Sequence, residues 1–293
     1  MSNLAESIAA GKFVVTAEVG PPKGTDVTHL LEMAELLRDH VDAINVTDQQ
    51  SSVMMLGSLT VCHLLHQRGI EPVFQVTCRD RNRIALQSDL LSAAVLGIEN
   101  VLCLTGDYVT LGDHPQAKPV FDLDAVTLLR AVAVLQEGHD LADKPLRGVP
   151  TFFPGAVVSP GANPLGPQIA KMEKKVAAGA RFFQTQAVYD PAQFETFVRQ
   201  VEHLHVPILV GVILLKSAGM ARFMNSNVAG VNVPDELIEE IGGVPRPDRP
   251  AKAVEIATRL IRDVKGMCQG VHFMTLGWER YVPQLVEEAG LGQ

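Results

Sequence analysis

The 293-residue chain lacks several features on which whole classes of protein depend. Lys and Arg total 25 against 33 Asp and Glu, a formal charge of −8, and no segment concentrates basic residues, so we expect no nucleic-acid partner. No stretch approaches the roughly 18 uncharged apolar residues of a membrane helix. The first residues, MSNLAESIAAGKF, show no charged leader followed by an apolar segment, so we expect neither export nor membrane insertion.

The chain also has few cysteines. There are four, at positions 62, 78, 103 and 268, with no CxxC pair and no Cys/His spacing suited to zinc. We interpret them as reduced thiols of a cytoplasmic protein and expect no metal site. Aromatic residues make up 5% of the chain and hydrophobic residues 47%, which is typical of a globular protein. At this length, composition allows two average domains or one large α/β barrel.

Short apolar runs alternate with amphipathic stretches along the chain. The first run stops at Pro21-Pro22, and the next stretch has leucines at helical spacing behind the candidate caps Thr25 and Asp26. The eight expected strands are 13–19, 43–46, 73–76, 101–104, 149–153, 181–185, 208–213 and 271–274. The expected helices are 25–40, 53–67, 82–96, 124–136, 165–178, 191–203, 217–224, 235–241, 251–264 and 279–288.

This alternation favours a closed barrel over an open sheet. Eight apolar strands, each followed by a helix, are what a parallel sheet covered on its outer face requires, and eight strands close into a barrel. We therefore predict an α/β fold, a single (β/α)8 TIM barrel over residues 1–293. The rival is a doubly wound sheet, but Pro21-Pro22-Lys23-Gly24 follows the first strand where that fold has GxGxxG opening a helix. Long Gly/Pro-rich connections are expected at 106–119 and 155–167.

Glu18 is the sharpest candidate for chemistry. In a barrel the active site lies at the C-terminal ends of the strands, where Glu18 stands between Ala17 and Val19, close to a rigid Pro-Pro turn. Partial burial there would favour the protonated carboxyl group, which can act as a general acid. The alternative is a glutamate paired with an Arg or Lys at the barrel rim, and position alone does not choose between them.

Three further features each allow two interpretations. Gly106 in Thr105-Gly106-Asp107 would let a flat ligand approach the backbone, although an ordinary turn is the simpler explanation. Gln184 and Gln186 share one face of a strand, where they could bind a heterocycle or a neighbouring strand. Lys175 fits a solvated helix charge better than a phosphate ligand on pattern alone.

The order of several motifs along the chain points to a known family. They are Ala17-Glu18-Val19-Gly20-Pro21-Pro22, Val76-Thr77-Cys78, Gly97-Ile98-Glu99-Asn100, Leu104-Thr105-Gly106-Asp107, Lys174-Lys175-Val176, Ala178-Gly179-Ala180, Thr185-Gln186, His272-Phe273 and Thr275-Leu276. Together they resemble methylenetetrahydrofolate reductase, a flavin-dependent barrel that reduces 5,10-methylenetetrahydrofolate to 5-methyltetrahydrofolate, a step of one-carbon metabolism that supplies methionine biosynthesis. The resemblance covers nearly the whole chain.

The resemblance implies roles for the residues of the reaction itself. Glu18 matches the family's catalytic acid, which would assist protonation of the folate N10 and open the five-membered ring to an N5 iminium that accepts hydride. Asp107 matches an aspartate beside both the flavin and the pterin, where its charge would favour hydride donation. Gln186 matches a glutamine that binds the pterin.

The resemblance also implies an FAD site and a ping-pong reaction in two half-reactions, with NADH or NADPH as a possible electron donor. Thr47 matches a threonine at the flavin, Lys175 a lysine on the FAD side, and Ala162 a position that lines the FAD. The remaining positions expected at the cofactor are Gln75, Thr105 and Gly106.

Some positions depart from the family pattern, and these departures leave the donor open. Relatives often have Arg at position 105, His at position 75 and Phe-Phe at positions 19 and 20. The loop 214–218 lacks a phenylalanine that stacks on folate or nicotinamide in some relatives. Arg79 and Arg81 could replace lost cofactor contacts.

Other assignments therefore stay open. One is a flavin-free pterin- or folate-binding barrel that transfers a one-carbon group. Another is a barrel subunit that docks on an iron–sulfur electron-transfer partner, since some relatives work with one. The family is commonly oligomeric, so the resemblance also implies a homo-oligomer.

Overall fold

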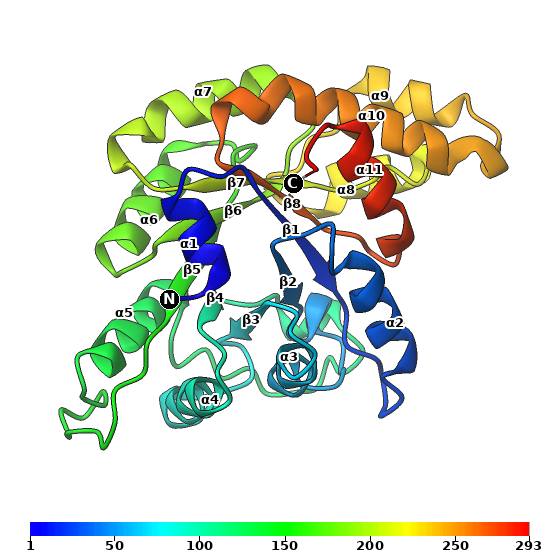
Figure 1. Cartoon of the computed structure of the whole chain (residues 1–293). Coiled ribbons are helices and arrows are strands. Elements are labelled where there is room, and N and C mark those ends of the chain that lie inside the picture. Colours follow the sequence, from blue (N-terminus) through cyan, green and yellow to red (C-terminus); the bar gives the residue numbers. More distant parts are fainter. Residues whose placement is uncertain (293) are drawn as a thin grey trace.

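The computed structural model describes residues 1–292, which form a closed parallel barrel (Figure 1). Each strand pairs with its neighbours in chain order, and β8 returns to β1. The strands are β1 (Val14–Val19), β2 (Ala43–Val46), β3 (Pro72–Thr77), β4 (Asn100–Leu104), β5 (Phe153–Val158), β6 (Phe182–Ala187), β7 (Ile208–Val212) and β8 (Gly270–Phe273). The predicted (β/α)8 barrel is confirmed, and the predicted range 1–293 ends one residue beyond the described part of the chain.

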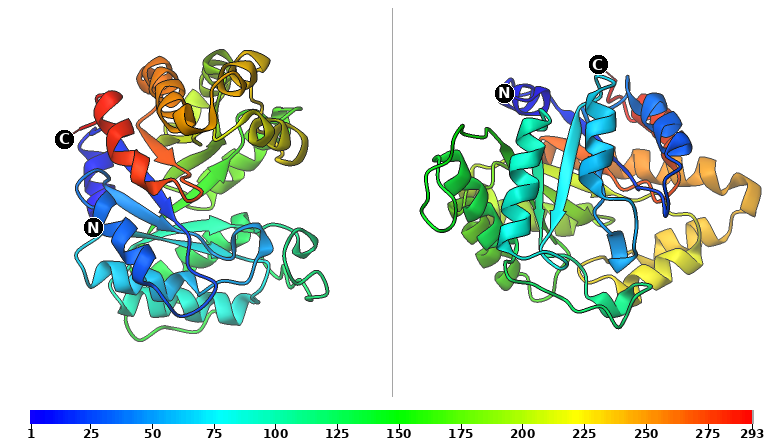
Figure 2. Two further views of the ribbon diagram at one scale, coloured as in Figure 1. Left: turned by 90° about the vertical axis from the view of Figure 1, so that its right-hand side faces the viewer. Right: turned by 90° about the horizontal axis from the view of Figure 1, so that it is seen from below.

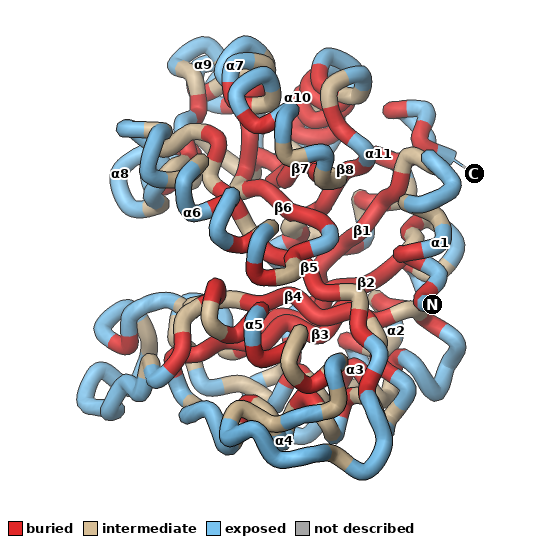
Figure 3. The backbone as a smooth tube through the Cα atoms, turned by 90° about the vertical axis from the view of Figure 1, so that its left-hand side faces the viewer, coloured by how far each residue is buried: buried red, intermediate tan, exposed pale blue. Residues whose placement is uncertain are grey.

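Helices surround the strands on the outside of the barrel (Figure 2). They are α1 (Asn3–Ala9), α2 (Thr28–Leu37), α3 (Ser58–His66), α4 (Arg83–Val95), α5 (Ala125–Gln136), α6 (Gly166–Ala177), α7 (Pro191–Val201), α8 (Ala218–Asn227), α9 (Asp235–Gly242), α10 (Arg249–Val264) and α11 (Val282–Glu288). The strands are almost wholly buried, whereas the helices turn one face to solvent (Figure 3). Within residues 1–292, no helix combines the length and apolarity needed to cross a membrane.

The fifth strand lies later in the chain than predicted. The expected strand 149–153 is wrong, because Val149 is 58% exposed and β5 runs from Phe153 to Val158. Pro154 and Gly155 look like a strand terminator, yet the glycine is required inside this strand: a Cβ at position 155 would lie 2.3 Å from the Phe182 ring. The connection expected to begin at residue 155 therefore begins after Val158.

The helix ends also differ in places. The helix expected from residue 25 begins at Thr28, and its N-cap residue, Val27, makes no side-chain capping bond. Asp26 instead accepts a hydrogen bond from the Thr28 N–H at 3.0 Å. Of the two candidate caps, only Asp26 therefore bonds the start of this helix.

Helix α1, which was not predicted, closes the N-terminal end of the barrel. Its Leu4 is fully buried and joins an apolar cluster inside the barrel with Val14, Val73 and Phe182. The Ser2 hydroxyl donates to Asn100 Oδ1 at 2.6 Å, which ties the helix start to the start of β4. With this end filled by apolar side chains, the opposite end, where the strands finish, is left to carry the polar groups.

Candidate active site

The inside of the barrel changes from apolar to polar toward the C-terminal ends of the strands. On β1, the inward-facing positions pass from Val14 through Thr16 to Glu18. Asn45 on β2 and Gln184 on β6 exchange two amide hydrogen bonds, at 2.9 and 3.1 Å. Because β2 and β6 are not adjacent strands, these contacts cross the barrel interior. Gln184 therefore bonds across the barrel, and not to the neighbouring strand that was one of its two interpretations.

The polar layer continues from Gln184 to β8. Gln184 Nε2 donates to Thr16 Oγ1 at 3.2 Å, and Thr16 Oγ1 lies 2.9 Å from His272 Nδ1. The other ring nitrogen, His272 Nε2, lies 3.4 Å from Glu18 Oε1. Thr16, Gln184 and His272 are all at most 3% exposed, so this row of groups is shielded from solvent.

Glu18 stands at the end of this row, at the top of β1. Gln75 Nε2 on β3 donates to Glu18 Oε1 at 2.9 Å, and the Thr275 hydroxyl donates to the Glu18 backbone carbonyl at 3.0 Å. Both side-chain neighbours, Gln75 and His272, face Oε1, and among residues 1–292 Oε2 has no protein partner. The Arg or Lys partner weighed from the sequence is not what Glu18 contacts. The residue is 9% exposed, and one carboxyl oxygen is held by the protein while the other accepts no hydrogen bond from residues 1–292.

The segment after β4 is fastened to the segment after β2. Asp107 is exposed, and its Oδ2 accepts a hydrogen bond from the Ser51 N–H at 3.1 Å. Gly106 has φ +95°, and the Thr105 hydroxyl accepts from the Ala125 N–H at 3.2 Å at the start of α5. Asp107 thus lies at the C-terminal end of the barrel, whereas the Thr105 side chain is engaged by the helix.

Two arginines fasten the segments that follow the strands, and Arg79 joins the segment after β2 to the segment after β4. Arg79 is 1% exposed and donates to the backbone carbonyls of Gln49 and Asp107 at 3.2 and 3.3 Å. Arg81 pairs with the carboxylates of Asp48 and Asp89. Most of the guanidinium nitrogens are therefore engaged by the protein, although the buried Nε of Arg81 has no hydrogen-bond partner among residues 1–292.

The remaining predicted residues are spread around the strand ends. Thr47 is 4% exposed next to the end of β1, where its N–H donates to the Val19 carbonyl at 3.2 Å. Gln186 is half-buried near the end of β6. Ala162 lies in the loop after β5, with its N–H donating to the Ser159 carbonyl at 3.2 Å.

Lys175 is not the solvated helix charge that its sequence pattern suggested. It is 5% exposed, and Nζ donates to the Val157 carbonyl on β5 at 2.6 Å. Burial, with a contribution from nearby Lys171, lowers the pKa of Lys175 to about 8. Its charged end faces the barrel wall between α6 and β5 and is not displayed at the surface.

Two residues of the site, Thr16 and Asn45, escaped the sequence analysis, and a third, His272, was named only as part of a family motif with no role. A signal for Thr16 existed, because it lies two residues before Glu18 and therefore on the same face of the strand. No comparable signal marked Asn45 or His272 as partners, since their contacts are made across the closed barrel.

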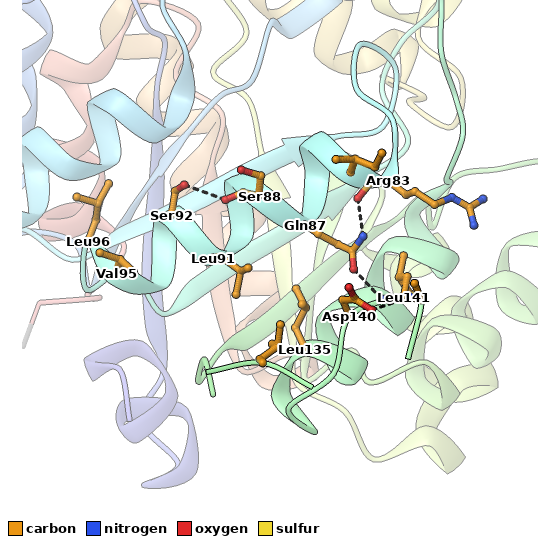
Figure 4. A pocket seen from close by; sticks show the side chains of 13 residues that line it. Arg83, Gln87, Ser88, Leu91, Ser92, Val95, Leu96, Leu135, Asp140 and Leu141 are labelled. Carbon is orange, nitrogen blue, oxygen red and sulfur yellow. Dashed lines mark hydrogen bonds between the residues drawn. The ribbon is translucent and has the colours of Figure 1, made fainter. Parts of the chain in front are cut away.

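A separate hollow lies outside the barrel, between α4 and the segment after α5 (Figure 4). Its volume is about 820 Å³, and its walls include Leu91, Leu135 and Leu141. None of the predicted site residues lines it. Among residues 1–292, no group of three or more His, Cys, Asp or Glu side chains is arranged to hold a metal ion.

Comparison with known proteins decides the family. The model of the family described as methylenetetrahydrofolate reductase matches residues 3–290. The chain belongs to the methylenetetrahydrofolate reductase family. Methylenetetrahydrofolate reductase 2 of Schizosaccharomyces pombe is 27% identical over 80% of this chain and 38% of its own length. A probable methylenetetrahydrofolate reductase (NADH) of Oryza sativa subsp. japonica is 23% identical over 99% of this chain and 50% of its own length.

The methylenetetrahydrofolate reductase fold is shared at full length with a solved structure. This is an uncharacterized protein from Clostridium thermocellum that binds two copies of 5-methyl-5,6,7,8-tetrahydrofolic acid. It superposes with a TM-score of 0.65, covers 99% of both chains and is 13% identical. In contrast, the chain spans only 38% and 50% of the two curated family members. At this identity the solved structure establishes the barrel alone.

Proposed function

We propose that this chain reduces 5,10-methylenetetrahydrofolate to 5-methyltetrahydrofolate with FAD as the hydride carrier, in two half-reactions at one site. The observation that carries the proposal is the carboxyl group of Glu18, at the end of β1 in a chain that the reductase family model matches from residue 3 to 290. The Clostridium thermocellum barrel, which binds the reaction product of this family, supports folate as the ligand.

The C-terminal end of the barrel is suited to a flat ring with polar edges. Glu18, Thr47 and Gln75 form a buried polar floor. Large exposed apolar side chains stand on the segments that follow the strands: Met54, Tyr108, Phe223 and Leu276. Ligand sites of this kind combine apolar walls with a few placed polar groups.

On this proposal, Thr47, Gln75, Gly106 and Asp107 would hold the flavin ring, and Gln186 would bind the pterin. Bound FAD would supply hydride transfer. Glu18 would donate the proton to the folate N10, using the oxygen that its neighbours leave free. Ala162, Thr105 and Lys175 remain predicted cofactor positions, although the Thr105 hydroxyl and the Lys175 ammonium would have to exchange protein contacts for cofactor contacts.

The decisive experiment separates the two half-reactions. Glu18→Gln removes the proton and keeps the shape, so flavin reduction by the donor should remain nearly intact while folate reduction falls by about 10²–10⁴-fold. Glu236→Gln, on the exposed face of α9, is the matched control and should leave both rates unchanged. Equal loss of both half-reactions in Glu18→Gln would remove its role as the acid.

The protein as purified provides a simpler test. It should be yellow and release flavin on denaturation. A colourless protein that binds folate would instead favour the one-carbon transferase. Anaerobic stopped-flow mixing with NADH, NADPH and reduced ferredoxin in turn identifies the donor, starting with NADH because the Oryza relative is named for it.

The proposal extends to cellular context and assembly. We infer a cytoplasmic protein, in keeping with four free and buried cysteines, and a homo-oligomer. Slow flavin reduction by both nicotinamides with fast reduction by ferredoxin would favour an iron–sulfur partner subunit. Light scattering of the purified protein measures the oligomer directly.

A further inference from the structure

We propose that His272 is a positioning residue for Glu18. By its place beside one carboxyl oxygen, His272 directs the proton of the acid to the other oxygen, which would face the ligand. This inference rests on the proposed function, because it concerns how the acid delivers its proton. It is carried by a single row of buried contacts that runs from Asn45 through Gln184, Thr16 and His272 to Glu18.

The first step is the orientation of the Gln184 amide. Its Oε1 accepts from Asn45 Nδ2 at 2.9 Å, so its Nε2 is the atom that faces Thr16. An amide nitrogen only donates, and Thr16 Oγ1 must therefore accept this hydrogen bond. The Thr16 hydroxyl can still donate one hydrogen bond through its own proton.

The second step is the tautomer of His272. The Thr16 proton can go to His272 Nδ1 at 2.9 Å or to the Val271 carbonyl at 3.5 Å. The shorter distance is within the usual range of a hydrogen bond, and the longer one is not. A hydroxyl that donates to Nδ1 leaves the ring proton on Nε2, because neutral imidazole has one donor and one acceptor nitrogen.

The third step is the position of the acid's proton. His272 Nε2 lies 3.4 Å from Glu18 Oε1, beyond the usual hydrogen-bond range, and Gln75 Nε2 donates to the same oxygen at 2.9 Å. An oxygen that already accepts a hydrogen bond and has a second N–H-bearing nitrogen nearby is the acceptor of the carboxylic acid, so the proton of protonated Glu18 belongs on Oε2. Among residues 1–292 Oε2 has no protein partner, so on this proposal it is the oxygen that would meet the ligand.

A spectroscopic test examines the tautomer without cofactor or substrate. In ¹⁵N-histidine NMR of the purified protein at neutral pH, the ring signals that vanish in His272→Gln belong to His272. They should report the Nε2–H tautomer, and Thr16→Val should weaken that preference while Thr16→Ser keeps it. A ring protonated on Nδ1 alone would overturn the inference.

A kinetic test examines the consequence. His272→Leu removes the donor and should slow the folate half-reaction by about 10–100-fold, with a much smaller effect on flavin reduction. His272→Gln places an amide N–H near the position of Nε2 and should recover most of that loss. Equal folate rates in His272→Leu and the wild-type protein, or equal loss in His272→Gln and His272→Leu, would overturn the positioning role.

The two tests also separate this inference from the proposed function. If His272→Leu fails to fold, the comparison of Thr16→Val with Thr16→Ser in the folate half-reaction takes its place, with a loss expected only for valine and equal rates overturning the role. If the wild-type protein itself reduces no folate, the proposed function fails, and the inference with it. If folate is reduced and the tautomer or the rates contradict the expectation, only the inference fails.

Discussion

The guanidinium group of Arg81 pairs with the carboxylate of Asp48, whose side chain is 2% exposed. Asp48 follows β2 and Arg81 follows β3, and the same carboxylate accepts from the N–H and the hydroxyl of Thr77, both at 2.9 Å. Burial acts to lower the pKa of Arg81, but the carboxylates of Asp48 and Asp89 outweigh it, and the net effect is a raised pKa. The pair fixes two neighbouring strand ends beside Gln75 and Glu18.

Removal of this arginine should destabilise the barrel. Arg81→Met leaves the buried Asp48 charge without its cationic partner, and we expect a loss of about 3 kcal/mol in the free energy of unfolding. Urea unfolding measures it. Arg199→Met is the matched control, because Arg199 pairs with Glu195 on the exposed face of α7 and its loss should cost no more than about 0.5 kcal/mol. Equal effects of the two variants would contradict the importance of the buried pair.

Gly106 is required for two reasons, its backbone conformation and the space around it. Its φ is +95°, and a Cβ would lie 3.0 Å from the Arg79 Cβ and 3.2 Å from the Thr77 Cβ. We expect Gly106→Ala to lower the free energy of unfolding by about 2–3 kcal/mol. Gly277 separates the two causes, because its φ is +84° and no atom lies within 4 Å of a Cβ there. Gly277→Ala should cost only about 1 kcal/mol, and a larger loss there than at Gly106 would contradict the steric contribution.

The barrel could be predicted from sequence because it depends on local patterns. Seven of the eight strands fall where apolar runs predicted them, and the candidate acid Glu18 followed from its place at a strand end. β5 was misplaced because glycine is required at position 155 by the Phe182 ring on the next strand, which leaves no room for a side chain. A contact between strands of this kind leaves no local sequence pattern. Helix α1 was missed because its seven residues are stabilised by the barrel end on which Leu4 packs.

The partners of Glu18 could not be predicted for a related reason. Gln75 lies 57 residues after Glu18 in the chain, and His272 lies 254 residues after it. Both side chains lie beside Glu18 only because the barrel is closed. Periodicity tells which face of a strand a residue occupies, but the register between strands decides which inward-facing residues lie at the same height. The polar row inside the barrel is therefore a property of the closed sheet.

The burial of Lys175 can be tested through the pH dependence of the free energy of unfolding. Its folded-state pKa of about 8 lies below the value of 10.5 for an ordinary lysine, because burial disfavours the charged form. Between these two values the unfolded chain holds a proton that the folded chain has released, so folding stability should rise with pH. We expect the free energy of unfolding of the wild-type protein, relative to Lys175→Met, to increase by roughly 2 kcal/mol between pH 7 and pH 10.

The comparison with Lys175→Met cancels the titration of all other groups, since both proteins carry them. Urea unfolding at several pH values gives the difference directly. Lys174→Met is the matched control, because Lys174 is exposed on the same helix, and its difference from the wild-type protein should stay flat with pH. A flat difference for Lys175→Met as well would mean that the folded chain releases no proton in this range, and the buried ammonium would have to be stabilised by more than the Val157 carbonyl.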